Sequence, residues 1–178
     1  MTPDAGRASV PRMALYRSST RELALAELPP KLGASVAEHA ARHQLELGAV
    51  RCWLTRSENP IEEGMMGKLF GRRANSADPD AEHVTAVVLH PTHLLMGTEG
   101  KARGVAVLSV PLGQASVTRG HPALEKLGAV AAEPGMQIDG LPGEHGRPGS
   151  YFVKLGEDAD GAACFGAVRA AIVAAKNR

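Results

Sequence analysis

The chain has few aromatic residues, few cysteines and almost no net charge, and each shortage excludes a class of protein. Aromatic residues make up 3% of the 178 residues, so a hydrophobic core must be built from Val, Leu and Ala. The formal net charge of +1 argues against a nucleic-acid binder that relies on a large basic field. The two cysteines, Cys52 and Cys164, lie inside apolar patterns, so we expect reduced core residues rather than a disulfide framework.

Long hydrophobic runs are also missing. No apolar run approaches the roughly 20 residues that a membrane-spanning helix needs. The first residues, MTPDAGRASVPR, lack the apolar centre of a secretory signal peptide. The length suits one domain with a single core. We therefore expect a cytoplasmic protein, with peripheral contact to the inner face of the membrane as an alternative.

Apolar, β-rich runs separated by turns occupy the centre of the sequence. The runs Val84–Leu89, Leu94–Met96 and Val105–Val110 are each closed by Gly or Pro, and short turn segments separate them. Strands joined by turns of this length pair as antiparallel neighbours, because a parallel crossover needs a dozen or more residues. The pattern therefore predicts a β-meander. Further strands are expected over residues 49–55, 112–119, 136–139 and 151–155.

Two amphipathic helices are expected on either side of these strands. Residues 29–47 begin with proline, repeat apolar residues at three- and four-residue steps, and are followed by Gly48 as a terminator. Residues 158–177 form the second helix, with Asp158 or Asp160 as N-cap. Its expected apolar stripe consists of Phe165, Val168, Ile172 and Ala175. Residues 1–27 are expected to form a loose tail, in which Ser19 and Glu22 fit the capping box of a short helix.

The order of these elements resembles the pleckstrin-homology-like fold. HPTHLLMGTEG is similar to the second hairpin of that family, and GVAVLSVPLGQASVTR to its fourth and fifth strands. YFVKLGEDADGAACFGAVRAAI resembles its last strand and helix, so the likeness covers about residues 49–176. One departure concerns the tryptophan that pleckstrin homology domains usually carry in the final helix, where this chain has Phe165. The composition, rich in Ala, Gly and Arg, suits a bacterial member of the superfamily.

The resemblance implies an α+β, mainly β, fold. In it a seven-stranded antiparallel barrel of two near-orthogonal sheets is capped by the C-terminal helix. The chain would then consist of the tail, 1–27, and one domain, 28–178. Within this domain lie an extra N-terminal helix over 29–47, the barrel over 49–155 and the capping helix over 158–177.

Catalytic chemistry is not indicated. Nucleophile, dinucleotide and redox motifs are missing, so we expect no enzyme and no cofactor. His39 and His43 share one helix face, but no third ligand is evident, so we expect no metal site. Cys52 alternates with Val50 and Leu54 on a face expected to be buried, where burial raises the pKa of a thiol and makes it inert.

The long loop over residues 58–81 is the best candidate for a binding element. It interleaves apolar and basic residues, as membrane-surface contacts do. The apolar members are Met65, Met66, Leu69 and Phe70, and the basic ones are Lys68, Arg72 and Arg73. The alternative is a lid that folds back over the open end of the barrel.

A basic rim follows from the resemblance. In the pleckstrin-homology-like fold the connections between strands 1 and 2, 3 and 4, and 6 and 7 lie at one end. In this chain those connections would carry Lys68, Arg72, Arg73, Lys101, Arg103 and Arg147. Such a rim would bind anionic lipid or a phosphorylated ligand.

We therefore expect a non-enzymatic binding or scaffolding module that contacts a protein or peptide and no nucleic acid. The strand after Leu112 is expected to offer an edge to an extended peptide, with Gln114, Ser116 and Thr118 as its polar face. The first alternative is anion binding at the basic rim. The second is a small-ligand carrier or enzyme that uses the barrel interior.

Overall fold

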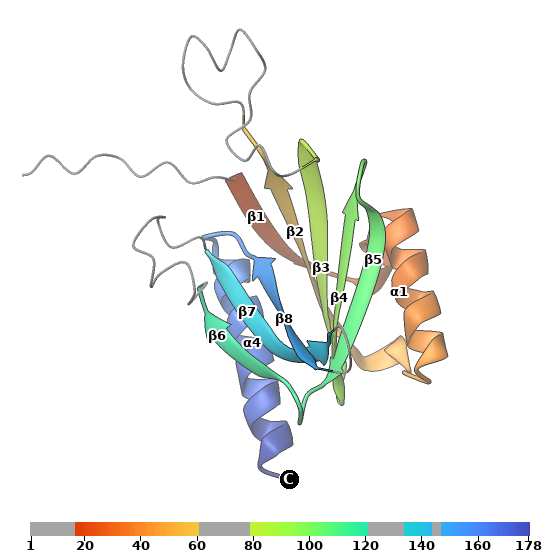
Figure 1. The fold of residues 1–178 in the computed structure, drawn as a ribbon, viewed down its shortest axis with the longest axis vertical. Helices are drawn as coiled ribbons and strands as arrows, with labels where there is room; N and C mark the ends of the chain where they lie inside the picture. The colour runs from red at the N-terminus through yellow and green to blue at the C-terminus, as the bar shows by residue number, and fades with distance from the viewer. Residues whose placement is uncertain (1–16, 61–78, 121–133, 144–146) are drawn as a thin grey trace, which may run out of the picture.

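Two antiparallel sheets and two long helices make up the described part of the chain. A computed structural model describes residues 17–60, 79–120, 134–143 and 147–178. One sheet has five strands in the order β1-β2-β3-β4-β5, and the other has three in the order β6-β7-β8 (Figure 1). The strands are β1 (Arg17–Leu23), β2 (Arg51–Glu58), β3 (Glu82–Leu89), β4 (His93–Gly100), β5 (Gly104–Pro111), β6 (Ser116–Arg119), β7 (Gly135–Pro142) and β8 (Pro148–Lys154). The helices are α1 (Pro30–Arg42) and α4 (Ala159–Lys176), with short 3-10 turns at Leu25–Glu27 and Leu47–Ala49.

The five-stranded sheet lies between two apolar clusters. Its outer face packs on α1, where Leu32, Val36 and Ala40 meet the sheet residues Cys52, Ala86, Val88 and Leu95. Its inner face packs on the three-stranded sheet and α4 through Trp53, Val87, Leu94, Met96 and Val110. Successive strand residues point to opposite faces, so each central strand, apolar on both sides, serves both clusters. The α+β, mainly β, class with two antiparallel sheets and a C-terminal helix is therefore confirmed.

The N-terminal segment differs most from the prediction. Residues expected to start a short helix form β1, which pairs antiparallel with β2 from Arg17↔Glu58 to Leu23↔Cys52. Pairing supplies a ladder of main-chain hydrogen bonds and buries Leu23, whereas a capping box stabilises a single turn. The described part of the chain thus has eight strands rather than seven, and the two sheets do not close into a barrel.

Helix α1 ends five residues before the predicted boundary. Gln44 adopts a left-handed conformation with φ of 56°, and the Leu45 amide then donates to the Ala40 carbonyl at 2.9 Å. The turn brings Leu45 against the outer apolar cluster. The helix therefore stops at Arg42, and Gly48 is not its terminator, because a long-range apolar contact fixes the turn earlier.

Helix α4 packs against both sheets and begins at Ala159, and its N-cap is Asp158, one of the two predicted candidates. It contacts β1 and β2 of one sheet and β6 and β7 of the other. Its buried side chains are Cys164, Val168 and Ile172. Phe165, predicted in that stripe, is only half-buried, and its ring lies 5.4 Å from the Arg119 guanidinium. The smaller Cys164 takes the buried position, which lets the helix lie close to the sheets.

The first turn of α4 covers the outer edge of β1. The two oxygens of the Asp158 carboxylate accept from different amides: Oδ1 from Gly161 at 2.7 Å and Oδ2 from Thr20 at 2.7 Å. One carboxylate thus caps the helix and satisfies an edge amide of the sheet. The Thr20 hydroxyl, 2.8 Å from that of Thr55, accepts in turn from the Gly156 amide at 2.7 Å.

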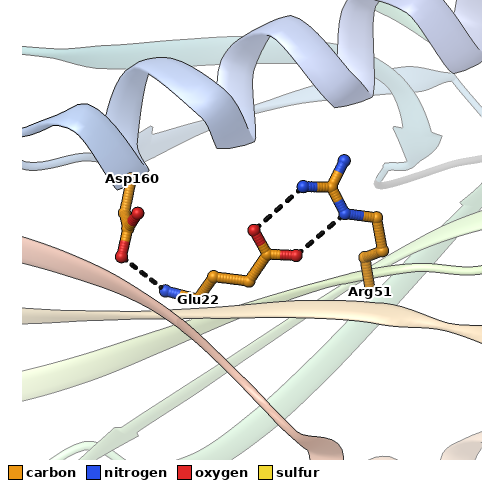
Figure 2. A network of polar contacts seen from close by, with 3 residues as sticks. All are labelled: Glu22, Arg51 and Asp160. Atoms are coloured by element: carbon orange, nitrogen blue, oxygen red, sulfur yellow. Dashed lines mark hydrogen bonds and ion pairs between the residues drawn. The ribbon is translucent and has the colours of Figure 1, made fainter.

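A polar network continues along this edge (Figure 2). Asp160 accepts from the Glu22 amide at 3.0 Å. The Glu22 carboxylate receives two hydrogen bonds from the Arg51 guanidinium, at 2.8 and 2.9 Å, which lower the pKa of Glu22. The same guanidinium lies 4.5 Å from the centre of the Trp53 ring.

None of the helices in the described residues combines the length and apolar character that a membrane span requires.

The two acidic residues of α4 should contribute unequally to stability. Asp158→Ala removes a helix cap and the acceptor of the Thr20 amide, so we expect a loss of about 1–3 kcal/mol in the free energy of unfolding. Asp160→Ala removes one exposed contact and should cost less than about 1 kcal/mol. Denaturant unfolding of both variants measures the difference. Equal losses of unfolding free energy in the two variants would show that the Asp158 bridge stabilises the fold no more than the Asp160 contact does.

Candidate functional site

A cleft opens on the outer face of the five-stranded sheet, beyond the first turn of α1. The helix lies directly on Gly97, where a Cβ atom would come within 2.8 Å of Leu32 Cδ1. Glu99 is two residues further along β4 on the same face, past the start of the helix. In Figure 1 the β4–β5 hairpin extends above the upper end of α1. The resulting cleft has a volume of about 530 Å³.

The floor of the cleft is one row of cross-strand partners. Arg56 pairs with Val84, Val84 with Glu99, and Glu99 with Val105, so four neighbouring strands contribute one residue each. The walls come from the segment that starts α1 and from the ends of β3 and β4. They include Pro29, Lys31, Glu82, His83 and Lys101.

The charged groups of the cleft do not pair with one another. Within the described residues, no ion pair or hydrogen bond involves the side chains of Lys31, Arg56 or Lys101. The same holds for Glu82 and Glu99. Moreover, Oε2 of Glu99 is buried and finds no hydrogen-bond partner among the residues that the structure describes. Buried acceptors of this kind are rare in native structures, because an unsatisfied group keeps its full desolvation penalty.

The structure places one of the six predicted rim residues, Lys101, in this cleft. Lys68, Arg72 and Arg73 lie outside the described residues, as do the membrane-contact candidates Met65, Met66, Leu69 and Phe70. Lys31 and Arg56 were not predicted. The available signal for Arg56 was its alternation with Cys52 and Leu54, which puts it on the outer face of β2.

Arg103 is held by Asp80. Its Nε donates to Asp80 Oδ2 at 2.9 Å, and the Ala102 and Arg103 amides donate to the same carboxylate at 2.6 and 3.3 Å. These bonds, first that of Ala102, hold the pKa of Asp80 below its usual range. Because Asp80 is almost fully buried, this arrangement fixes the β4–β5 turn. The guanidinium of Arg103, a predicted rim residue, is thus already paired with the Asp80 carboxylate.

Arg147 lies on the β7–β8 connection, away from the β4–β5 turn. In Figure 1 the end of β7 and the start of β8 are near the lower end of β5, whereas the β4–β5 turn is at the upper end. Gly140, near the end of β7, accordingly lies against the Gln114 carbonyl, beyond the C-terminal end of β5. The structure therefore places Arg147 apart from Lys101 and Arg103, and the rim as a whole stays a prediction because Lys68, Arg72 and Arg73 lie outside the described residues.

The outer edge of β5 is a second candidate surface. In the described part of the chain, β5 ends the five-stranded sheet and no strand pairs with its outer edge. Its eight residues, GVAVLSVP, carry no charge, and Leu108 keeps 36% of its surface exposed. The predicted peptide edge was β6, but Gln114 belongs to the preceding turn and the strand is four residues long. β6 also lies against α4.

The two cysteines lie in the core, as predicted. Both are free and buried. Burial raises the pKa of the Cys52 thiol to about 12 and that of Cys164 to about 12. The thiolate, which is the reactive form, is therefore not populated at neutral pH.

Four histidines gather where α1 ends beside the sheet. His39 Nε2 lies 2.8 Å from Ser109 Oγ on β5, and its ring centre lies 4.4 Å from that of His43. The ring centres of His90 and His93 lie 6.2 Å apart, and both rings are within hydrogen-bond distance of the Thr92 hydroxyl. The pKa of His39 is lowered, mainly by burial and to a smaller extent by the charges of His43 and Arg42. The pKa of His93 is lowered in the same way, by burial first and then by the charges of His90 and His43. Within the described residues, no group of three or more His, Cys, Asp or Glu is placed to hold a metal.

No family model, curated protein or solved structure matches this chain. The described part of the chain offers two candidate surfaces: a cleft whose charged groups do not pair with one another, and the uncharged outer edge of β5.

The histidine cluster should make the protein less stable in mild acid. The pKa values of His39 and His93 are lower in the folded protein than the value near 6.5 of an unfolded chain. As the pH falls, the unfolded chain therefore binds protons at a higher pH than the folded protein does. The free energy of unfolding is thus highest above about pH 6.5 and decreases below it. Chemical denaturation between about pH 7.5 and 5.5 should show this decline. The double variant His39→Gln, His93→Gln should flatten it.

Ser109→Ala is the control for the cluster. It removes the hydrogen bond to His39 and keeps all four rings, so it should lower stability at every pH and leave the slope unchanged. The pKa of Asp80 is also lowered, but its contribution is lost only below about pH 4, outside this window. A slope unaffected by the double variant would contradict the assignment.

Proposed function

We propose that the protein is a non-enzymatic binding module that holds an extended segment of a partner protein along the outer edge of β5. We further propose a variant of the pleckstrin-homology-like architecture, in which β2–β5, β6–β8 and α4 follow the order of that fold. β1 and α1 are then additions. The proposed setting is the cytoplasm, in keeping with two free, buried cysteines.

The contrast between the two edges of the five-stranded sheet supports this proposal. On β1, the amides of Thr20 and Glu22 are satisfied by Asp158 and Asp160. On β5, the half from Gly104 to Leu108 has exposed or half-exposed side chains and no charged residue. Proteins usually protect an open edge with lysine, proline or a bulge, since an unprotected edge accepts further strands. β5 has a proline only at its last position, Pro111.

The side chains of β5 define the chemistry of the segment that would bind. Val105 and Val107 lie toward the outer cluster near α1, and Ala106 and Leu108 point to the other face. A strand paired with β5 would place alternate side chains beside these two sets. Main-chain pairing would supply affinity, and apolar side chains at alternate positions would supply selectivity. The expected partner is therefore an uncharged segment rich in β-branched residues.

The other two functions predicted from the sequence have less support. Binding of anionic lipid depends on Lys68, Arg72 and Arg73, which lie outside the described residues, and it stays a prediction. A ligand in the barrel interior would compete with the inner apolar cluster, whose side chains from both sheets and α4 pack against one another between the sheets.

A charge placed on the open edge tests the proposal. The probe is an eight-residue peptide of alternating valine and threonine, added to the isotope-labelled protein. We expect amide shift changes concentrated on Gly104–Leu108. Leu108→Lys should weaken binding about tenfold or more, because the lysine blocks the approach of an apolar strand.

Val173→Lys is the matched control, since among the described residues Val173 is the other large apolar side chain with high exposure, 51%, and it lies on α4. This variant should bind the peptide as the parent does. Shift changes that map to β6, or equal binding by both lysine variants, would overturn the proposed position. No shift change on any strand at millimolar peptide would overturn strand addition itself.

A further inference from the structure

We propose that the cleft between the start of α1 and the outer face of the sheet binds a small phosphate ester that also carries a hydrogen-bond donor. The cleft shares Gly104 and Val105 with the β5 edge, but its charged groups come from α1, β2, β4 and the β4–β5 turn, so the proposal does not depend on the edge function.

Three cations from three elements converge on the cleft. Lys31 comes from α1, Arg56 from β2 and Lys101 from the β4–β5 turn. None is neutralised by a carboxylate in the described structure, although Glu82 and Glu99 line the same cleft. A phosphate presents several oxygens to several donors at once, and the planar guanidinium of arginine matches two of them. A single carboxylate ligand would leave part of this positive charge unused.

Glu99 determines what else the ligand must carry. No described residue donates to its buried Oε2, so a bare anion would leave this acceptor unsatisfied and would be repelled by it. A molecule with an N–H or O–H group beyond its phosphate can satisfy both requirements. The phosphate would lie toward Lys31, Arg56 and Lys101, and the donor toward Glu99. Nucleotides and sugar phosphates belong to this class.

The size and surface of the cleft agree with this ligand class. Its volume of about 530 Å³ lies within the range of small-molecule sites. The floor alternates charged and apolar residues, so Val84 and Val105 offer contact surface between the polar groups. A carbon framework can therefore lie on the valines while its polar ends reach Arg56 and Glu99.

Calorimetric titration at low ionic strength tests the proposal with four probes: GMP, AMP, glucose 6-phosphate and inorganic phosphate. We expect at least one ester to bind about tenfold or more tightly than inorganic phosphate. Arg56→Ala should weaken both the ester and inorganic phosphate. Glu99→Ala should act in opposite directions: it should weaken the ester about tenfold and strengthen inorganic phosphate, because it removes an acceptor and a repulsive charge together.

Exposed residues on the helices provide matched controls. Glu38→Ala on α1 and Arg169→Ala on α4 change the same net charges away from the cleft and should leave all affinities unchanged. Glu99→Met, which keeps the side-chain length but has neither an oxygen acceptor nor a charge, replaces Glu99→Ala if the latter lowers the melting temperature. The proposal is overturned if no ester binds more tightly than inorganic phosphate. It is also overturned if the Glu99 variant affects ester binding no more than Glu38→Ala does.

Discussion

The carboxylate of Asp158 links the two ends of the fold. One oxygen caps α4 and the other accepts the Thr20 amide on the edge of β1. If this bridge were missing, the helix would lack its cap and the sheet would expose a second open edge. Because it is present, α4 is held against both sheets and strand addition at β1 is blocked. In the described part of the chain, β1 and β5 therefore differ: Asp158 and Asp160 accept edge amides of β1, whereas no strand pairs with the outer edge of β5.

Helix α1 determines how the outer face of the sheet is used. It rests on Gly97, which has no Cβ to keep Leu32 away, and it buries the central part of the face. At one end of the helix, the contact of His39 with Ser109 attaches it to β5, and His43 lies close enough to His93 at the start of β4 to lower its pKa. At the other end, the uncovered row from Arg56 to Val105 becomes the cleft. The helix thus divides one sheet face into a packed region and a polar recess.

The sequence predicted the elements that are stabilised locally and missed those that depend on distant partners. The meander and the Asp158 cap could be predicted because alternation, turn residues and capping are short-range signals. β1 could not, since Arg17–Leu23 becomes a strand only through pairing with β2. Likewise, α1 ends at Arg42 because Leu45, just beyond the turn at Gln44, finds an apolar contact in the tertiary structure. For the site, Lys101 was predicted from its turn, but its proximity to Lys31, Arg56 and Glu99 depends on register and helix position, which composition and periodicity do not encode.

The bridge from Asp158 to Thr20 has a consequence for how the chain is made. The two residues are separated by 138 positions, so β1 leaves the ribosome long before the segment that seals its edge. Contacts between such distant residues form late, since the entropy of closing the intervening loop must first be overcome. Until residues 158–160 have been synthesised, the nascent five-stranded sheet would have open edges at both β1 and β5. During synthesis, the partly made protein is therefore more exposed to strand-mediated aggregation than the finished one, and it is at this stage that a chaperone would be of most use.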